Sequence, residues 1–330
     1  MEPIIGLIHN QPIPPGQPNW ESSADVMTQV EAIERALTGL GRQGRRIPFT
    51  RDLDRFVKAV RENRIGAAIN LCETVDEDPQ FAGHPAAVLE LLGIPFSGSP
   101  SAAIASSTDK QLAKLILKGG GVQTPGSLYY NGSFDASPEL LHFPVILKPQ
   151  CQDASIGIDQ ESVIGSAAQL QARAEDFHRQ FGPFLAEEFI DGREFNVSVV
   201  GNAELRVMPI AEIDFSGFPR ELFNIVGYRA KWDEDSLEYR ESKRIFPVLE
   251  ASLQERLEST AKRCYRLFGL RDYGRVDVRV SGGGPIHVLE VNANPCLSPD
   301  AGFAAAARQA GMDYRDMVAQ LLSLVEERGI

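Results

Sequence analysis

The chain has 330 residues, of which 43% are hydrophobic and 24% charged, and its formal net charge is -12. These values are typical of a globular protein with two or three domains. The acidic balance argues against a nucleic-acid partner, because such domains usually present a basic face. No segment has the pattern of a signal peptide or of a membrane span, so we expect a cytoplasmic protein. The four cysteines are too widely spaced to indicate a zinc site or a disulfide framework.

Residues 1–100 alternate between strand and helix signals. Apolar runs of strand length occur at 4–9, 46–49, 66–71 and 94–97. Helical signals lie between them, at 26–40, 52–62 and 85–92. This alternation predicts a parallel, two-sided α/β domain.

Two further domains are expected, at residues 101–183 and 184–330. In the first, Thr108 is the predicted N-cap of a helix over 109–118. Expected strands at 143–147 and 157–163 and a helix at 167–181 complete it. In the second, strands are expected at 184–190, 194–200, 205–213, 274–280 and 286–291, with helices around 253–267 and 314–325. Residues 216–243 have no clear period, which is typical of a functional lid. We therefore expect an α/β first domain followed by α+β domains.

The strongest functional signal lies in the last two expected strands. Because side chains alternate along a strand, Arg275 shares a face with Asp277, and Glu290 shares a face with Asn292. If the glycine-rich turn makes a hairpin, Asp277 lies opposite Glu290, and these facing carboxylates need a positive charge to offset their repulsion. Two carboxylates and an amide oxygen suit Mg²⁺ held together with substrate phosphates. The alternative is a solvated, charged face of the sheet.

Two weaker signals accompany it. Lys148 ends a fully apolar strand, where an ammonium group suits a phosphate contact, and residues 150–157 could supply backbone N–H groups to phosphate oxygens. A lysine that reaches solvent explains Lys148 alone equally well. Residues 187–194 could present backbone groups to an adenine edge and Glu194 to a ribose, although a surface strand with a tight turn has the same pattern.

In their order along the chain, these segments resemble the ATP-grasp signature of D-alanine–D-alanine ligases. The resemblance covers nearly the whole chain and is carried by residues 93–98, 108–110, 145–149, 155–157, 187–194, 231, 275–277 and 290–295. It implies an ATP-grasp fold preceded by a Rossmann-like domain, and an ADP-forming ligase that joins a carboxylate to an amine. It also implies a homodimer.

The resemblance assigns roles to individual residues. Those expected at ATP are Lys110, Lys148, Ser155, Ile156 and Gly157 for the phosphates, Glu187 and Ile190 for adenine, and Glu194 for the ribose. Those expected at magnesium are Asp277, Glu290 and Asn292, which would hold two Mg²⁺ ions that Mn²⁺ could replace. Those expected in the chemistry are Lys231 at the transferred phosphoryl group, Arg275 at the tetrahedral intermediate and Glu21 at the first substrate's ammonium group.

The positions that contact amino acids in this family differ here. Alanine, tryptophan, cysteine and alanine replace the family's Ser, Tyr, Gly and Ser at Ala154, Trp232, Cys296 and Ala301. The family's His-Gly segment is here residues 70–73. We therefore expect small-molecule acid and amine substrates other than D-alanine, joined through an acyl phosphate. The alternatives are an ATP-grasp small-molecule kinase and a nucleotide-binding protein without turnover.

Overall fold

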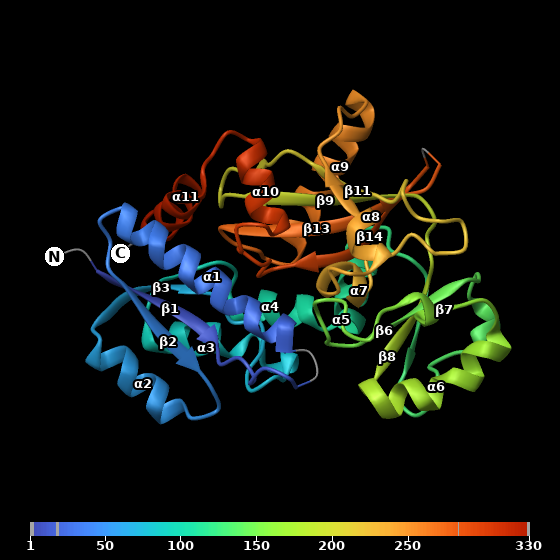
Figure 1. The fold of residues 1–330 in the computed structure, drawn as a ribbon, viewed down its shortest axis with the longest axis horizontal. Coiled ribbons are helices and arrows are strands. Elements are labelled where there is room, and N and C mark those ends of the chain that lie inside the picture. Colours follow the sequence, from blue (N-terminus) through green and yellow to red (C-terminus); the bar gives the residue numbers. More distant parts are fainter. Residues whose placement is uncertain (1–2, 18–19, 283, 329–330) are drawn as a thin grey trace.

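The computed structural model describes residues 3–17, 20–282 and 284–328, without the side chains of residues 21 and 22. The strands of these residues form three sheets, which Figure 1 shows with helices packed around them. Within the described part of the chain, no helix is both long and apolar enough to cross a membrane.

The first sheet is parallel and has the order β2-β1-β3-β4. Its strands are β1 (Ile4–Asn10), β2 (Gly44–Phe49), β3 (Ile65–Asn70) and β4 (Phe96–Ser97). The helices between them are α1 (Trp20–Gly39), α2 (Leu53–Glu62) and α3 (His84–Leu92). Asp52 caps α2 by accepting a hydrogen bond from the backbone N–H of Arg55, and Gly93 ends α3 in the left-handed conformation. The predicted Rossmann-like first domain is confirmed.

The second sheet is antiparallel and has the order β5-β8-β6-β7. Its strands are β5 (Ser127–Tyr130), β6 (Val145–Pro149), β7 (Val163–Ile164) and β8 (Phe184–Glu188), and α6 (Ala167–Phe181) packs on it. The predicted strand over 157–163 is wrong. Asp159 and Ser162 form a capping box that makes Gln160–Ser162 a 3-10 turn, so only Val163–Ile164 pairs with β6.

The predicted cap of the helix that precedes this sheet is also wrong. Thr108 is the last residue of α4 (Ser101–Thr108), and Asp109 caps α5 (Lys110–Gly119) by accepting a hydrogen bond of 3.0 Å from the backbone N–H of Leu112. An ionised carboxylate satisfies the free N–H groups of a helix start at least as well as a threonine hydroxyl does.

The third and largest sheet is antiparallel along β12-β11-β9-β13-β14, and β10 also pairs with β9. Its strands are β9 (Arg193–Val200), β10 (Arg206–Val207), β11 (Ala211–Asp214), β12 (Lys243–Ile245), β13 (Tyr273–Val280) and β14 (Ile286–Asn292). Helix α9 (Ala251–Leu267) packs on β9, β13 and β14. Helices α10 (Gly302–Gln309) and α11 (Tyr314–Glu326) follow, and α11 contacts α1 and β4 of the first domain. The expected lid contains two short helices, α7 (Tyr228–Trp232) and α8 (Leu237–Glu241).

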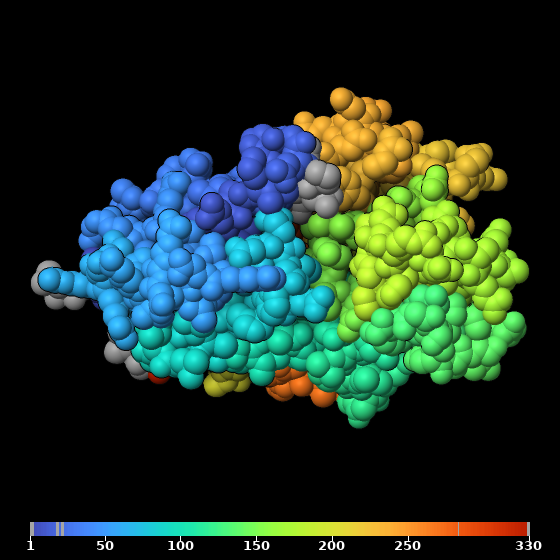
Figure 2. Space-filling view, turned by 90° about the horizontal axis from the view of Figure 1, so that it is seen from below, coloured from blue at the N-terminus to red at the C-terminus, as the bar shows by residue number. Residues whose placement is uncertain are grey.

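The chain passes from the second sheet to the third between β8 and β9. Strand β8 pairs with β5 and β6. Strand β9, which follows after only four intervening residues, pairs with β11 and β13. We call residues 189–192 the tether. Gly192 has φ +150°, and a Cβ atom there would lie 2.3 Å from the carbonyl oxygen of Val280. The tether therefore runs directly against the end of β13. In Figure 2 the first domain (blue) and the second sheet (green) lie at opposite ends of the molecule.

We predict that Gly192→Ala lowers the free energy of unfolding by about 3 kcal/mol, because its methyl group overlaps a backbone carbonyl that cannot move aside. Gly132→Ala is the matched control: Gly132 also has a positive φ, of +83°, but a Cβ there meets nothing within 4 Å. We expect it to cost only about 1 kcal/mol of backbone strain. Urea unfolding of both variants measures the difference, and equal losses would contradict the close approach.

Candidate active site

A cleft of about 610 Å³ lies where the three sheets meet. Its walls include Glu73 just after β3, Lys148 at the end of β6, and Asp277 in β13. Ligands of parallel α/β sheets bind beyond the carboxyl ends of the strands, and the first domain contributes that edge here. Of the residues that the sequence singled out, those in the cleft wall are Lys110, Lys148, Ser155, Glu187, Ile190, Glu194, Lys231, Arg275, Asp277, Glu290 and Asn292.

The predicted hairpin of β13 and β14 is confirmed, with Asp277 directly opposite Glu290. The two oxygens of Asp277 accept hydrogen bonds of 2.8 Å from Nε and Nη2 of Arg275. Asn196 and Asn292 also donate to this carboxylate, at 2.8 and 3.0 Å. Burial alone would lower the pKa of Arg275, but the attraction of Asp277 outweighs burial and raises it. Arg275 therefore keeps its positive charge in the cleft.

One detail of the hairpin differs from the expected alternation. A register shift after Asp277 leaves Leu289 as an extra residue on β14, because Val278 pairs with Val288. Such bulges turn a side chain away from its regular face. Leu289 consequently lines the cleft together with Glu290.

The donor set of the hairpin fits magnesium. Asp277, Glu290 and Asn292 offer two carboxylates and one amide, the hard oxygen donors that Mg²⁺ prefers. Among the described residues there is no group of three or more His, Cys, Asp or Glu that could hold a metal. This composition suits an ion bound jointly by a few side chains and by phosphate oxygens, rather than one enclosed by protein ligands.

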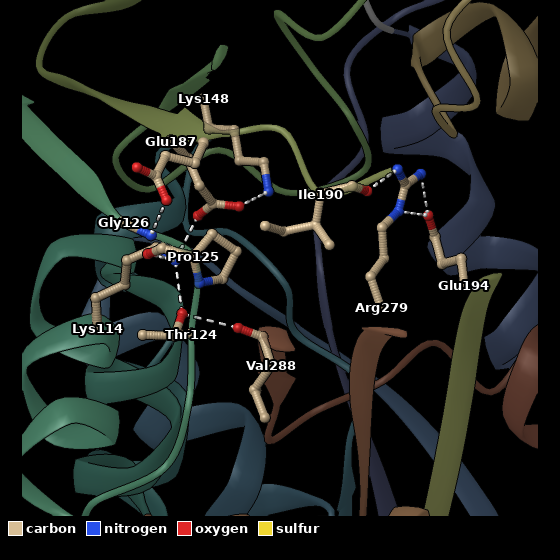
Figure 3. A network of polar contacts seen from close by, with 11 residues as sticks. Lys114, Thr124, Pro125, Gly126, Lys148, Glu187, Ile190, Glu194, Arg279 and Val288 are labelled. Carbon is tan, nitrogen blue, oxygen red and sulfur yellow. Dashed lines mark hydrogen bonds and ion pairs between the residues drawn. The ribbon is translucent and has the colours of Figure 1, made fainter. Parts of the chain in front are cut away.

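Glu187, in the cleft wall, lies between two lysines (Figure 3). Its oxygens are 2.6 Å from Nζ of Lys148 and 2.5 Å from Nζ of Lys114, and only 2% of its side chain is exposed. Burial alone would raise the pKa of Glu187, but the two ammonium groups outweigh burial and lower it. Lys114 is itself fixed by a hydrogen bond of 2.7 Å to Thr124, whose hydroxyl donates to the Val288 carbonyl in β14. The carboxylate thus links α5, β6 and β8.

The loop that follows β6 has an unusual backbone. Ala154 and Ser155 both have positive φ, of 55° and 63°, although neither is glycine. Consecutive left-handed residues are costly and persist only where the surroundings hold them in place. Here the lid contributes, because Ser155 Oγ donates to the Val226 carbonyl and Trp232 Nε1 to the Ala154 carbonyl. Lys110 donates to the Gln152 carbonyl at 2.5 Å.

Three predicted residues are placed differently from the rest. Ile156 and Gly157 belong to the loop after β6 but are not in the cleft wall. The side chain of Glu21 lies outside the described part of the structure, so its expected role stays a prediction. Lys231, by contrast, lines the cleft from α7, and no carboxylate of the described residues lies within ion-pair distance of its ammonium group.

One part of the cleft wall, which we call the acidic part and define by Asp25, Glu73, Cys296 and Ser298, carries two carboxylates. Asp25 accepts hydrogen bonds from the Cys296 thiol at 3.2 Å and from the Ser298 hydroxyl at 3.0 Å. Burial raises the pKa of Glu73 to about 7, although Gln29 donates to it at 3.0 Å. No basic group of the described residues lies within ion-pair distance of either carboxylate.

Several residues in the cleft wall or directly behind it were not predicted, yet the sequence contains signals for them. Asp25 lies one helical turn after Glu21, and Lys114 one turn after Lys110. Glu73 follows the carboxyl end of β3, where α/β sheets place their ligands. Arg279 is the next residue after Arg275 and Asp277 on the same face of β13.

Comparison with solved structures defines the class of protein. The fold matches that of D-alanine–D-alanine ligase from Bacillus anthracis, in a structure complexed with ATP, with a TM-score of 0.77 over 99% of this chain and 98% of that chain at 21% sequence identity. A second structure of the same enzyme gives a TM-score of 0.76. The fold is therefore that of ATP-grasp proteins, with a Rossmann-like domain in front, as predicted.

Sequence comparison identifies the family. Residues 129–323 match the family described as D-ala D-ala ligase C-terminus. The chain is 34% identical to a D-alanine–D-alanine ligase of Desulforudis audaxviator, over 90% of this chain and 92% of that protein. It is also 30% identical to an uncharacterized protein, y4sG, of Sinorhizobium fredii, over 80% of this chain and 75% of that protein. The chain belongs to the D-alanine–D-alanine ligase family and is an ATP-dependent, ADP-forming ligase.

The position of Glu187 leads to a prediction about pH. Because its pKa is lowered in the folded protein, the ionised carboxylate stabilises the fold above the ordinary glutamate pKa of about 4.3. That contribution disappears as the pH falls through the lowered folded value. Glu187→Gln should lower the free energy of unfolding by about 3–5 kcal/mol at pH 7, and by progressively less below about pH 4.

Urea unfolding between pH 7 and pH 3.5 measures this difference. Glu175→Gln is the control, because Glu175 pairs with Arg179 on the exposed face of α6 with 82% of its side chain accessible. Exposed pairs contribute little. A loss in Glu187→Gln that does not change with pH would show that the two lysines do not stabilise an ionised carboxylate.

Proposed function

We propose that the protein joins a carboxylic acid to an amine through an acyl phosphate, and that its substrates differ from D-alanine. The observation that carries this proposal is the convergence of opposite charges in one cleft. Lys110 and Lys148 line one side, and the facing carboxylates Asp277 and Glu290 line the other with Arg275 beside them. This arrangement suits a triphosphate whose last phosphoryl group is transferred next to a developing oxyanion.

In the first step, an oxygen of the substrate carboxylate attacks the γ-phosphorus of ATP. The bond from that phosphorus to the bridging oxygen breaks, and ADP leaves with the electron pair. Lys110, Lys148 and the backbone of residues 155–157 hold the phosphates. Glu187 and the Ile190 backbone hold adenine, and Glu194 holds the ribose. Lys231 contacts the transferred group, which fits an exposed lysine on the lid without a carboxylate partner among the described residues.

In the second step, the amine attacks the carbonyl carbon of the acyl phosphate. The tetrahedral intermediate then collapses, the C–O bond to phosphate breaks, and the amine proton is lost. Arg275 stabilises the oxyanion, because its guanidinium group is always charged and presents forked donors. The protein acts by positioning the reactants and by neutralising charge, and neither step requires a nucleophilic side chain.

Magnesium completes this site in the proposal. Asp277, Glu290 and Asn292 would hold the metal. Two ions fit this site, because ATP would supply part of their oxygen ligands. When bound, Mg²⁺ neutralises the charge that develops on the phosphate oxygens.

The proposal of a different substrate is supported by residues of the cleft wall at positions where the family's amino-acid contacts are replaced. The Cys296 thiol is bound to Asp25, and the Ala154 carbonyl is bound to Trp232. These contacts differ from those that serine and tyrosine hydroxyls would make at the same places, so they favour another acid and amine.

The test is a screen of amino acids and small acids in pairs, read by ADP release. We expect release only when an acid and an amine are both present, and none with D-alanine alone. For a productive pair, an acid labelled with ¹⁸O in its carboxylate should transfer one label to inorganic phosphate, because the acyl phosphate keeps that oxygen. A phosphorylated product without an amide bond would identify a kinase. Unlabelled phosphate would exclude the acyl phosphate.

We further predict that Asp277→Asn lowers kcat on the order of 10²–10³-fold, because it removes a carboxylate that would hold Mg²⁺ against the triphosphate. Asp176→Asn is the control, since Asp176 is exposed on α6 and pairs only with Arg179 among the described residues. Circular dichroism shows whether each variant is folded. A folded Asp277→Asn enzyme with wild-type turnover would remove Asp277 from the site.

A further inference from the structure

Arg279 is a buried cation in the cleft wall to which none of the roles above is assigned. It lies in β13, two residues after Asp277 and on the same face, and it is only 3% exposed. Burying a guanidinium group is costly unless its donors are satisfied. The partners of those donors therefore indicate what the residue holds in place.

The strongest partner is Glu194, whose side chain is 12% exposed. Nε and Nη2 of Arg279 lie 3.0 and 2.7 Å from the same oxygen of Glu194, Oε2. A forked arginine–carboxylate pair usually engages both carboxylate oxygens. Here Oε1 accepts no hydrogen bond from the described residues. The pair thus fixes the orientation of Glu194 and leaves one oxygen available at the cleft wall.

The remaining donors of Arg279 reach two other segments, of which Figure 3 draws the tether residue Ile190. Nη1 donates to the carbonyl oxygen of Ile190, in the tether, at 2.8 Å. Nη2 also donates to the carbonyl oxygen of Asn224, in the lid. The guanidinium group lies 5.0 Å from the centre of the Phe189 ring, which adds a cation–π contact. One side chain therefore connects β9, the tether and the lid.

The segments that Arg279 connects are those proposed to surround the nucleoside. Ile190 is the proposed adenine contact and Glu194 the proposed ribose contact, and Arg279 binds both of them. The pair leaves one carboxylate oxygen of Glu194 free at the cleft wall while Arg279 also fixes the neighbouring backbone of Ile190. Arg193, one residue before Glu194, offers a comparison, because it forms a forked pair with both oxygens of Glu212 outside the cleft.

We propose that Arg279 is a positioning residue for nucleoside recognition: it holds Glu194 so that Oε1 faces the ribose hydroxyls, and it fixes the Ile190 carbonyl at the edge of the base. This inference rests on the proposed binding of ATP in this cleft. It assigns to Arg279 the selection of a ribonucleotide over a 2′-deoxyribonucleotide, because the carboxylate accepts from the 2′-hydroxyl only while it is correctly oriented.

Equilibrium binding of ATP and 2′-deoxyATP, each with Mg²⁺, tests this proposal without any acid or amine substrate. We expect the wild-type protein to bind ATP on the order of tenfold more tightly than 2′-deoxyATP, the value of one hydrogen bond to a charged acceptor. Arg279→Met should weaken ATP binding more than 2′-deoxyATP binding, so that the ratio of the two Kd values approaches one. Arg279→Lys should restore part of the ratio.

Two further variants keep the test decisive. Arg279→Met could unfold because it leaves Glu194 without its partner, so Arg279→Met/Glu194→Gln removes both charges and should show the same loss of discrimination as Glu194→Gln alone. Arg193→Met is the matched control and should leave the ratio unchanged.

A folded Arg279 variant with the wild-type ratio would overturn the proposal. A wild-type protein that binds ATP but does not discriminate would overturn it while leaving the ligase assignment intact, whereas a protein that binds neither nucleotide would overturn both.

Discussion

The two faces of β13 are the constraint on which the rest of the structure depends. One face carries Val276, Val278 and Val280, which are at most 3% exposed and anchor the strand in the core between β9 and β14. The other face carries Arg275, Asp277 and Arg279 beyond the buried Tyr273, and the strand's own packing directs these charged groups into the cleft. Because the core fixes the backbone, the spacing of these charges is fixed as well. A rigid strand holds charged groups more accurately than a loop could, which is what stabilising a short-lived charge requires.

Several charges of the cleft are paired within the protein. Glu187 balances Lys148 and Lys114, and Asp277 balances Arg275. Every such pair lowers the cost of holding an ion away from water. When a polyanion enters the cleft, the charged side chains exchange their partners within the protein for partners on the polyanion. The free energy of binding is therefore the difference between two arrangements in which these charges are paired. This accounts for a chain that is strongly acidic overall and yet contains a site suited to a triphosphate.

Features that depend on residues close together in the sequence were predicted, whereas features that depend on contacts between distant segments were not. The hairpin register and the facing of Asp277 and Glu290 follow from a period of two over a few residues, and that prediction was correct. The bulge at Leu289 was missed, because a register shift arises from pairing rather than from local pattern. Lys114 was missed for a related reason: its burial makes sense only with Glu187, which lies far away along the chain. Helix α10 was also missed, because residues 302–307 form one short unbroken apolar run, which does not by itself distinguish a helix from a strand. The homodimer and the domain boundaries stay predictions.

The short tether between β8 and β9 has a thermodynamic consequence. The cleft takes walls from both the second and the third sheet, and only residues 189–192 join β8 to β9. A ligand that touches both walls gains its full contact energy only when the two sheets are correctly spaced. The measured affinity for such a ligand is the intrinsic affinity multiplied by the fraction of molecules that already have this spacing. Substitutions far from the cleft that change this fraction would therefore alter the apparent Kd without touching a single ligand contact.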